Sequence, residues 1–411
     1  MRKLFAKIHL WLSIPLGILI SIICLTGAIL VFEQEITQAL NPNLYRVEAA
    51  SGSTPLSPSQ LAEAISRQVP DTLQLTSLQF AQDPDKPVWA GFRNAGRKTL
   101  SVNPYTGEVN GWSQSYPFFQ EVRKLHRWLL DAPARKGEKS VGKVVVGVTT
   151  LLMVVILLSG LVIWIPRTSK ALKNRLKISC TKGWRRFWYD SHAATGIYTL
   201  VFLLVMALTG LTWSFGWYRT AAYSLFGATP QTMEAGHGNA GNREAGATSQ
   251  RNHTHPDRQP DSRPRRTGTD ESDTRPKNAQ RPYRTWDQVL AGLQQTYPSY
   301  TSIKLERNSA QIITSPEGSL RKSDTARFQA EDGTITGITT SEQVPISQKM
   351  KGYFYSFHTG TWGGMWTKIL YFLAAFLGGL LPLSGYYLWY QKETCSSLRR
   401  NARWYVTFTF S

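Results

Sequence analysis

Four histidines lie directly before long apolar runs of the chain, where their imidazoles could bind a metal. They are His9, His126, His192 and His358. Imidazole is the commonest metal-binding side chain in proteins, and an ionisable group at the edge of an apolar run is costly enough to indicate a function. Any one of them could instead anchor the chain at an interface, as Trp and Tyr do. One histidine for each of four runs favours a binding role.

The four apolar runs predict four transmembrane helices, because a helix needs about 20 apolar residues to cross a membrane. The runs are Leu10–Phe32, Val144–Ile165, Ala193–Trp217 and Ile369–Tyr390. We expect the first to be an uncleaved anchor rather than a signal peptide. Its apolar stretch is longer than that of a signal peptide, and no small-residue cleavage site follows it.

Basic residues predict the orientation of these helices. The chain has 47 Lys and Arg against 27 Asp and Glu, a formal net charge of +20, and the excess gathers at the N-terminus, in the connection 166–190 and in the C-terminal tail. Positively charged loops stay in the cytoplasm, so we expect both termini inside and segments 33–140 and 218–368 outside. Topology then accounts for the charge, and no nucleic-acid partner is expected because no nucleic-acid-binding motif is present.

The chain is predicted to be internally duplicated. His9 precedes a Thr-Gly pair by 17 residues and so does His192, while Lys143 and Lys368 each precede a Ser-Gly pair by 16. The outside segments repeat as well, since each has an amphipathic helix followed by short strand-like stretches and turns. We therefore expect a membrane α-helical protein with four transmembrane helices and two small α+β domains outside.

Topology sorts the four histidines into two pairs. His9 and His192 both enter their helices from the cytoplasm, and His126 and His358 both lead in from outside. Two imidazoles are the axial ligands that a six-coordinate haem iron needs, and the flat, apolar macrocycle fits between the helices of a bundle. A closed zinc site would need four protein ligands. We therefore expect one haem b at each pair, two in all.

Glycines and cations give weaker indications of the same sites. Gly27 lies five helical turns beyond His9, and Gly210 relates to His192 in the same way, so each glycine could leave space for a macrocycle at the opposite end. Close helix packing explains these glycines equally well. Nearby cations could pair with haem propionates, although anchoring explains the inner ones better. The cations are Lys7, Arg185 and Arg186 inside, and Arg123, Lys124, Arg127 and Lys351 outside.

These motifs, in this order, resemble the PepSY-associated transmembrane family of bacterial iron-regulated inner-membrane proteins, which includes ferric-siderophore reductases. The matching elements are Lys7-Ile-His9 with Thr26-Gly27, Leu125-His126-Arg127 with Ser159-Gly160-Leu161, His192 with Thr209-Gly210, Phe357-His358 with Ser384-Gly385, and the PepSY-like ending Tyr105-Thr-Gly107-Glu108-Val109. The resemblance covers nearly the whole chain except the tract 229–284. The second domain departs from it, with Asp332-Gly-Thr-Ile in place of that ending.

The resemblance implies a haem-binding reductase of the bacterial inner membrane. It would take electrons from an unidentified cytoplasmic or membrane donor, through haems ligated by His9 and His192 and by His126 and His358, to a ferric siderophore in the periplasm. A non-enzymatic membrane sensor or protease-regulating protein in iron homeostasis is the alternative. A metal transporter would instead need ionisable groups near the bilayer midplane.

The domain organisation follows from these spans and repeats. In chain order we expect a first transmembrane helix (1–32), a periplasmic PepSY-like domain (33–125), a second transmembrane helix (126–166), a basic cytoplasmic loop (167–191), a third transmembrane helix (192–217), a disordered periplasmic linker (218–284), a second PepSY-like domain (285–350), a fourth transmembrane helix (351–390) and a cytoplasmic tail (391–411). The linker is expected to be disordered because it lacks apolar periodicity. Its His237, His253 and His255 are expected to be solvated rather than to bind metal.

Overall fold

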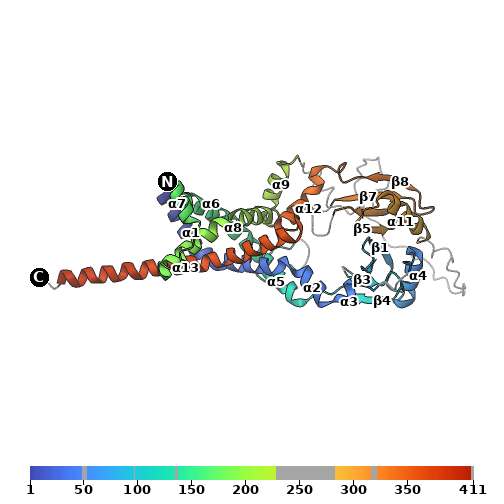
Figure 1. Ribbon diagram of the computed structural model, residues 1–411, viewed down its shortest axis with the longest axis horizontal. Helices are drawn as coiled ribbons and strands as arrows, with labels where there is room; N and C mark the ends of the chain where they lie inside the picture. The colour runs from blue at the N-terminus through green and yellow to red at the C-terminus, as the bar shows by residue number, and fades with distance from the viewer. Residues whose placement is uncertain (49–52, 97, 135–137, 228–282, 316–321, 409–411) are drawn as a thin grey trace, which may run out of the picture.

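Four long helices form the centre of the molecule. The computed structural model describes residues 1–48, 53–96, 98–134, 138–227, 283–315 and 322–408, with side chains as far as 394. In this part of the chain the helices long and apolar enough to cross a membrane are α1 (Arg2–Val31), α6 (Val141–Trp164), α8 (Trp184–Ser214) and α13 (Gly364–Phe408), the last over Gly364–Thr394. They confirm the four expected transmembrane helices (Figure 1).

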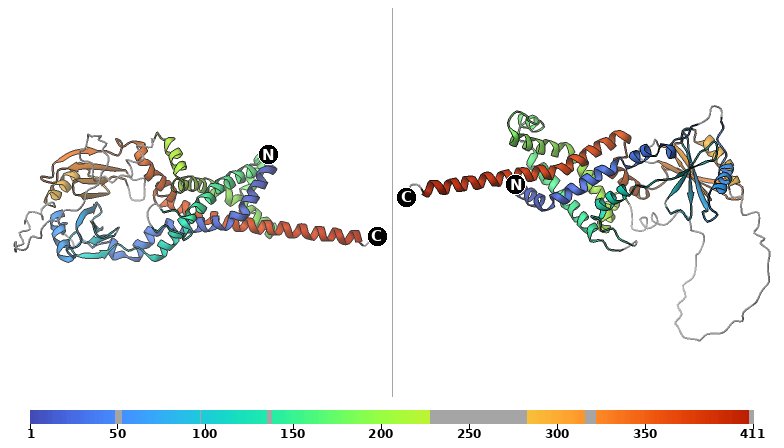
Figure 2. Two further views of the ribbon diagram at one scale, coloured as in Figure 1. Left: turned by 180° about the vertical axis from the view of Figure 1, so that it is seen from behind. Right: turned by 90° about the horizontal axis from the view of Figure 1, so that it is seen from below.

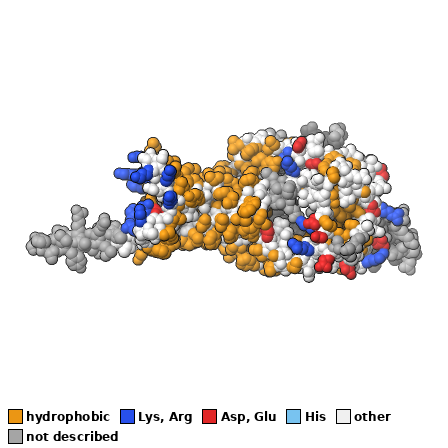
Figure 3. Space-filling model, viewed as in Figure 1, with side chains coloured by type: hydrophobic (Ala, Val, Ile, Leu, Met, Phe, Trp, Pro, Cys, Tyr) orange, Lys and Arg blue, Asp and Glu red, His pale blue; other side chains and the backbone are white. Residues whose placement is uncertain are grey.

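The four helices pack as a ring in the order α1, α6, α8 and α13, so α1 lies diagonally opposite α8. Ile20, Met153 and Leu203 are buried inside this ring. Figure 3 shows that apolar side chains also cover the outside of the bundle. Helices that are apolar all round are typical of membrane spans, where the surrounding solvent is lipid.

Shorter helices flank the bundle. They are α2 (Glu33–Leu40), α3 (Pro42–Tyr45), α5 (Pro117–Trp128), α7 (Ser169–Arg175), α9 (Gly216–Ser224) and α12 (Ile346–Thr359). Figures 1 and 2 show α2, α5, α9 and α12 at the end of the bundle that carries the sheet, and α7 at the other end with the start of α1. These short helices extend the bundle beyond its four spans at both ends.

Three of the transmembrane helices begin at different residues than expected. The expected segments began at 126, 192 and 351. His126 instead lies in α5 and His358 in α12, and a break separates each from the span that follows. α5 ends where Leu129 takes a φ of 49°, and α12 ends at Gly360 with a φ of 73°. A left-handed residue stops a helix, and apolar periodicity does not reveal it; α8, by contrast, begins early, at Trp184.

The expected disordered linker, 218–284, differs from the structure at its start. Residues 228–282, with His237, His253 and His255, lie outside the described residues, but 218–224 belong to α9. Tyr223 of α9 stacks on Phe354 of α12 with ring centroids 5.3 Å apart, and it is buried there beside Met350. This aromatic packing holds α9 on α12 and explains why the stretch is helical.

Eight antiparallel strands form one continuous sheet beyond the bundle (Figures 1 and 2). They are β1 (Leu75–Ala81), β2 (Val88–Phe92), β3 (Thr99–Val102), β4 (Val109–Trp112), β5 (Ser302–Glu306), β6 (Ser309–Ile313), β7 (Ser323–Phe328) and β8 (Ile335–Thr339). The order is β4-β3-β2-β1-β5-β6-β7-β8. The two expected α+β domains are therefore joined edge to edge through β1 and β5, which removes one exposed edge from each.

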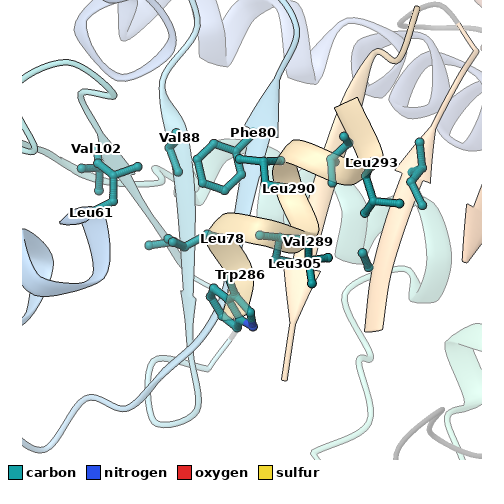
Figure 4. Close-up of a cluster of buried hydrophobic side chains, with 14 of the residues drawn as sticks. Leu61, Leu78, Phe80, Val88, Val102, Trp286, Val289, Leu290, Leu293 and Leu305 are labelled. Carbon is teal, nitrogen blue, oxygen red and sulfur yellow. The ribbon is translucent and has the colours of Figure 1, made fainter. Parts of the chain in front are cut away.

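α4 (Pro58–Gln68) and α11 (Arg284–Thr296) cover one face of this sheet and share a single core with it. Leu78 of β1 and Leu305 of β5 pair directly across the junction, and both are 0% exposed. Trp286 of α11 is buried in the same cluster (Figure 4). Asp287 accepts hydrogen bonds from the backbone N–H of Ser59 at 2.8 Å and from its hydroxyl at 2.5 Å. The two halves thus form one packed body.

Truncating Leu78 should loosen both halves of the sheet. Leu78→Ala removes a fully buried side chain and should cost about 2–5 kcal/mol of stability. Because β1 and β5 share one core, amide hydrogen exchange should become faster in β5–β8 as well as in β1–β4. Thr325→Ala, at an exposed position of β7, is the control and should leave exchange unchanged. Faster exchange confined to β1–β4 would show that the halves fold independently.

Candidate functional site

The structure brings the four histidines together in the two pairs that topology predicted. Near one end of the bundle, His9 of α1 faces His192 of α8 with ring centroids 6.4 Å apart and ring planes at 86°. At the other end, the ring of His126 of α5 lies 6.2 Å from that of His358 of α12, with planes at 52°. We call these the inner pair and the outer pair. Each takes one histidine from each half of the chain.

Each imidazole is held at Nδ1 by a neighbouring helix. The backbone acceptors at Nδ1 are the carbonyls of Ile156 for His9 (3.0 Å), Ile23 for His126 (2.9 Å) and Met206 for His358 (2.9 Å). The ring of His192 likewise has a backbone hydrogen bond to Leu381. Three residues after each acceptor stands a Ser or Thr whose hydroxyl also contacts Nδ1. In the same order these are Ser159 (3.2 Å), Thr26 (3.2 Å), Thr209 (3.3 Å) and Ser384 (2.8 Å). All four rings are therefore oriented by the same pattern of residues.

These contacts determine which ring nitrogen carries the proton. A backbone carbonyl only accepts hydrogen bonds, so Nδ1 must donate. Each hydroxyl already donates to a carbonyl of its own helix, so it too accepts from Nδ1. A neutral imidazole protonated at Nδ1 carries its lone pair on Nε2. Among the described residues all hydrogen bonds of the four rings involve Nδ1, which leaves Nε2 free to bind a metal.

A glycine follows each of these hydroxyl residues and makes room for the ring. A Cβ would lie 3.2 Å from Cε1 of His9 if added to Gly160, 3.1 Å from that of His126 at Gly27, 3.1 Å from that of His358 at Gly210 and 3.6 Å from that of His192 at Gly385. The first three distances are tighter than an ordinary contact. We call each hydroxyl residue and its glycine a cradle. Of the two explanations that the sequence left open for Gly27 and Gly210, the structure favours close packing, because an imidazole from another helix lies against each glycine.

An apolar cavity of about 380 Å³ lies between the inner histidines. All four membrane helices line it, with side chains such as Leu10, Leu161, Leu200 and Leu381. Within the described part of the chain, no group of three or more His, Cys, Asp or Glu side chains is placed to hold a metal ion. The inner pair therefore offers two nitrogen ligands inside a hydrophobic chamber, which suits a large apolar group better than a bare ion.

The cations expected at the inner pair do not line this cavity. Lys7 and Arg185 are exposed. Arg186 instead forms an ion pair with Asp190, whose carboxylate lies 2.8 Å from its Nε and is buried. Asp190 also accepts a hydrogen bond from the backbone N–H of Ser179 at 3.3 Å. The contacts among Arg186, Asp190 and Ser179 hold the connection between α7 and α8 in place. The charge of Arg186 is therefore not directed into the cavity.

The cations that do line the inner cavity are Arg175 of α7 and Lys392 of α13. Sequence reasoning missed both. Arg175 reaches the cavity because α7 packs against α8, and from there the guanidinium donates to the carbonyls of Ile163 and Trp164 at the end of α6. Nothing in a run of basic residues distinguishes the one that folds inward. Only Lys392 could have been found from the sequence, because it follows the Ser384-Gly385 pair by about two helical turns.

At the outer pair, Arg127 is the expected cation whose positive charge helps to lower the pKa of both His126 and His358. The side chain is exposed, and its guanidinium lies 4.3 Å from the ring centre of Trp128. Two of the other expected cations form ion pairs with carboxylates, and the third does not act on either histidine of the pair. Arg123 pairs with Glu33, Lys124 pairs with Glu121, and Lys351 is exposed. Arg127 is thus the outer cation best placed to meet an anionic group at the pair.

Burial also sets the protonation of the outer pair, which lies outside the four spans. It lowers the pKa of His126 to about 4, with a smaller contribution from the neighbouring His358. Burial lowers the pKa of His358 as well. Both imidazoles are therefore neutral at pH 7, which is the form that binds a metal.

Comparison with known families agrees with this architecture. The sequence model of the PepSY-associated TM region matches residues 6–392, a range that contains both histidine pairs, the four cradles and the whole sheet. No curated protein sequence matches the chain. Because the family match spans nearly the entire sequence, this protein belongs to the PepSY-associated transmembrane family.

Proposed function

We propose that this protein is a di-haem reductase of the bacterial inner membrane, which takes electrons from a donor on the cytoplasmic side or within the membrane and delivers them to a ferric siderophore in the periplasm. The observation that carries the proposal is the free Nε2 lone pair on both imidazoles of each pair. Two such pairs, one at each end of a membrane bundle, are what a transmembrane electron carrier requires. Family membership supports the membrane location.

The spacing of each pair fits one metal ion between two imidazoles. A metal–imidazole bond is about 2.0 Å long and the nitrogen lies about 1.1 Å from the ring centre, so two imidazoles on opposite sides of an ion have centroids roughly 6 Å apart. The measured separations are 6.4 Å and 6.2 Å. A structural zinc site takes four protein ligands, whereas a porphyrin brings four nitrogens of its own and needs only the two axial ones.

His9 and His192 would hold the inner haem, and His126 and His358 the outer one. Bound haem iron supplies one-electron transfer, because it is stable in both the ferrous and the ferric state. The cradles keep each ring in one orientation and keep its proton on Nδ1, so no proton has to leave Nε2 before the imidazole can bind. The apolar walls between the inner pair exclude water and favour a flat hydrophobic group.

The two pairs lie at opposite ends of the bundle. His9 and Gly27, which contacts His126, are separated by 18 residues of α1, and this is about 27 Å of helix. The hydrocarbon core of a membrane is about 30 Å thick. Figure 3 shows Lys and Arg side chains gathered at the end away from the sheet. By the positive-inside rule this supports an inner pair at the cytoplasmic face and a sheet in the periplasm.

A ferric siderophore is the substrate that best fits this direction. Siderophores hold iron through hard oxygen ligands, which bind Fe(III) far more tightly than Fe(II), so one added electron loosens the iron. The sheet lies at the end of the outer pair, where a periplasmic substrate would approach (Figure 1). A transporter would instead need its histidines near the middle of the bundle, and all four lie toward its ends.

Haem content tests the proposal most directly. The purified protein should contain about two haems per chain, and His192→Ala or His358→Ala should each remove about half, because each pair holds one. The double variant His126→Ala/His358→Ala should lose no more than either single change, since both residues serve one site. His253→Ala is the control and should keep the full haem content. A colourless but folded protein would favour the sensor alternative.

Filling a cradle should empty one site without touching a ligand. In Gly160→Val the new side chain would displace the ring of His9, whose Cε1 already lies 3.2 Å from a Cβ at this position. The variant should lose about half the haem, since overpacking a tight contact forces its neighbour aside. Gly352→Val, where a Cβ meets nothing within 4 Å, is the matched control. Full haem in Gly160→Val would show that His9 is not held as the structure indicates.

Electron delivery across the membrane separates a reductase from a haem-binding sensor. Vesicles that contain the protein and a trapped, membrane-impermeant reductant should reduce a ferric chelate added outside, read as Fe(II) captured by a coloured chelator. His9→Ala and His126→Ala should each reduce the rate nearly to that of protein-free vesicles, because each removes one of two sites in series. His237→Ala should leave the rate unchanged. Normal rates in both site variants would rule out this route.

A further inference from the structure

Hydrogen-bond donors gather at the cytoplasmic end of the inner cavity. Of the described residues, Arg175 and Lys392 are the only Lys or Arg side chains in its lining, and no Asp or Glu joins them. Trp164 also lines the cavity, and its indole Nε1 is buried with no hydrogen-bond partner in the described part of the chain. We call Trp164, Arg175 and Lys392 the inner donor cluster. It contains both of the charged side chains among the described residues that line the cavity.

We propose that the inner donor cluster binds the carboxylates of the group held by His9 and His192, so that the propionates of the inner haem lie at the cytoplasmic mouth of the cavity. The inference rests on the proposed function and adds an orientation to it. A haem has one apolar edge and one edge with two carboxylates. A cavity with apolar walls and one cationic end accepts such a molecule in only one direction.

Arg175 is already positioned for this role. Its Nη1 donates to the carbonyls of Ile163, at 3.2 Å, and Trp164, at the C-terminal end of α6, where backbone carbonyls lack donors within the helix. A guanidinium has five N–H donors in a fixed plane, so Nε and Nη2 remain for a carboxylate. Guanidinium–carboxylate bonds are charge-assisted and often bidentate. The helix end therefore holds the guanidinium in place at the cavity.

Trp164 gives an independent indication that a ligand oxygen belongs here. Nearly all buried donors in proteins have an acceptor, and the apolar wall around this indole offers none. Trp389 is the counterpart of Trp164, because each follows the serine of a cradle by five residues. Trp389 is 37% exposed. The unsatisfied donor thus stands on the side of the cavity where Arg175 lies. A carboxylate bound by Arg175 would provide the missing acceptor.

Lys392 supplies a second positive charge at the same mouth. It is exposed and makes no ion pair with the described residues. Lipid phosphates could engage Lys392 and Arg175 at the membrane surface, whereas Trp164 has a buried indole donor that an exposed lysine alone would leave unpaired. One carboxylate-bearing occupant of the cavity accounts for all three side chains together.

Haem and its dimethyl ester, which lacks both carboxylates, separate these explanations. The affinity for each compound is measured with full-length His358→Ala protein that has been stripped of haem, so that binding occurs only at the inner pair. The ester should bind at least about tenfold more weakly than haem, because it loses charge-assisted bonds. Trp164→Phe and Arg175→Gln should each weaken haem binding several-fold and have little further effect on the ester, since the interaction is already absent. Trp184→Phe and Lys173→Gln, which do not line the cavity, are the controls.

Each outcome decides the proposal. Equal affinity for haem and ester before any change to the cluster would overturn the orientation and leave the reductase intact. Substitutions that weaken haem and ester alike would show that the cluster supports the fold or contacts lipid, and the proposal would be wrong. Thermal unfolding of the stripped variants checks that they fold, and Arg175→Gln keeps the test valid if Trp164→Phe does not. Failure of both iron compounds to bind would remove the proposed function along with this inference.

Discussion

The hydrogen bond from a histidine ring to a carbonyl of the next helix, made four times, is the contact on which both sites depend. A helix carbonyl that already serves its own backbone has a second lone pair to offer. The hydroxyl three residues later shares that carbonyl, and the glycine after it lets the ring approach. Carbonyl, hydroxyl and glycine therefore act as one unit. In a medium without water, an imidazole donor left without such an acceptor would be costly, so the unit fixes the orientation of each ring.

The same bond links the helices to one another. α1 carries His9 and cradles His126, and α8 carries His192 and cradles His358, while α6 and α13 cradle the inner rings. Every membrane helix thus contributes to the inner pair. The outer pair also depends on α5 and α12, which lie against α1 and α8. The geometry of either pair is set by helix packing across the whole bundle.

Sequence reasoning predicted the parts of this arrangement that depend on local pattern. Four apolar runs and the bias of basic loops were sufficient to place the spans and to assign His9 with His192 and His126 with His358. Which ring each Thr-Gly or Ser-Gly pair holds could not be read in this way, because it depends on which helices are neighbours. The break at Leu129 was missed for another reason, since a leucine in the left-handed region has no compositional signal. Arg175 was missed because its hydrogen bonds to the end of α6 depend on how α7 packs against α8.

The joined sheet was also beyond sequence reasoning. Each half has its own helix and strand pattern, which predicted two small α+β domains but not that their strands join in one sheet. The pairing of Ser77 with Glu306 joins positions more than 200 residues apart, and no short-range periodicity reports such a contact. Its effect is to tie the outer ends of the two halves together above the outer pair. The sheet thereby fixes the relation between halves that the bundle also needs.

That each pair takes one histidine from each half has a consequence for how such a site can change. Neither half alone contains a complete site, yet two identical copies of one half, related by a two-fold axis, would contain both. The antiparallel junction of β1 with β5 is the contact that such a symmetric homodimer would make. Joining the halves in one chain frees them from symmetry. Lys368 is buried and bonded to Glu35, whereas Lys143 at the equivalent position is exposed. A single chain can therefore change the residues around one histidine of a pair while the residues around the other histidine stay the same.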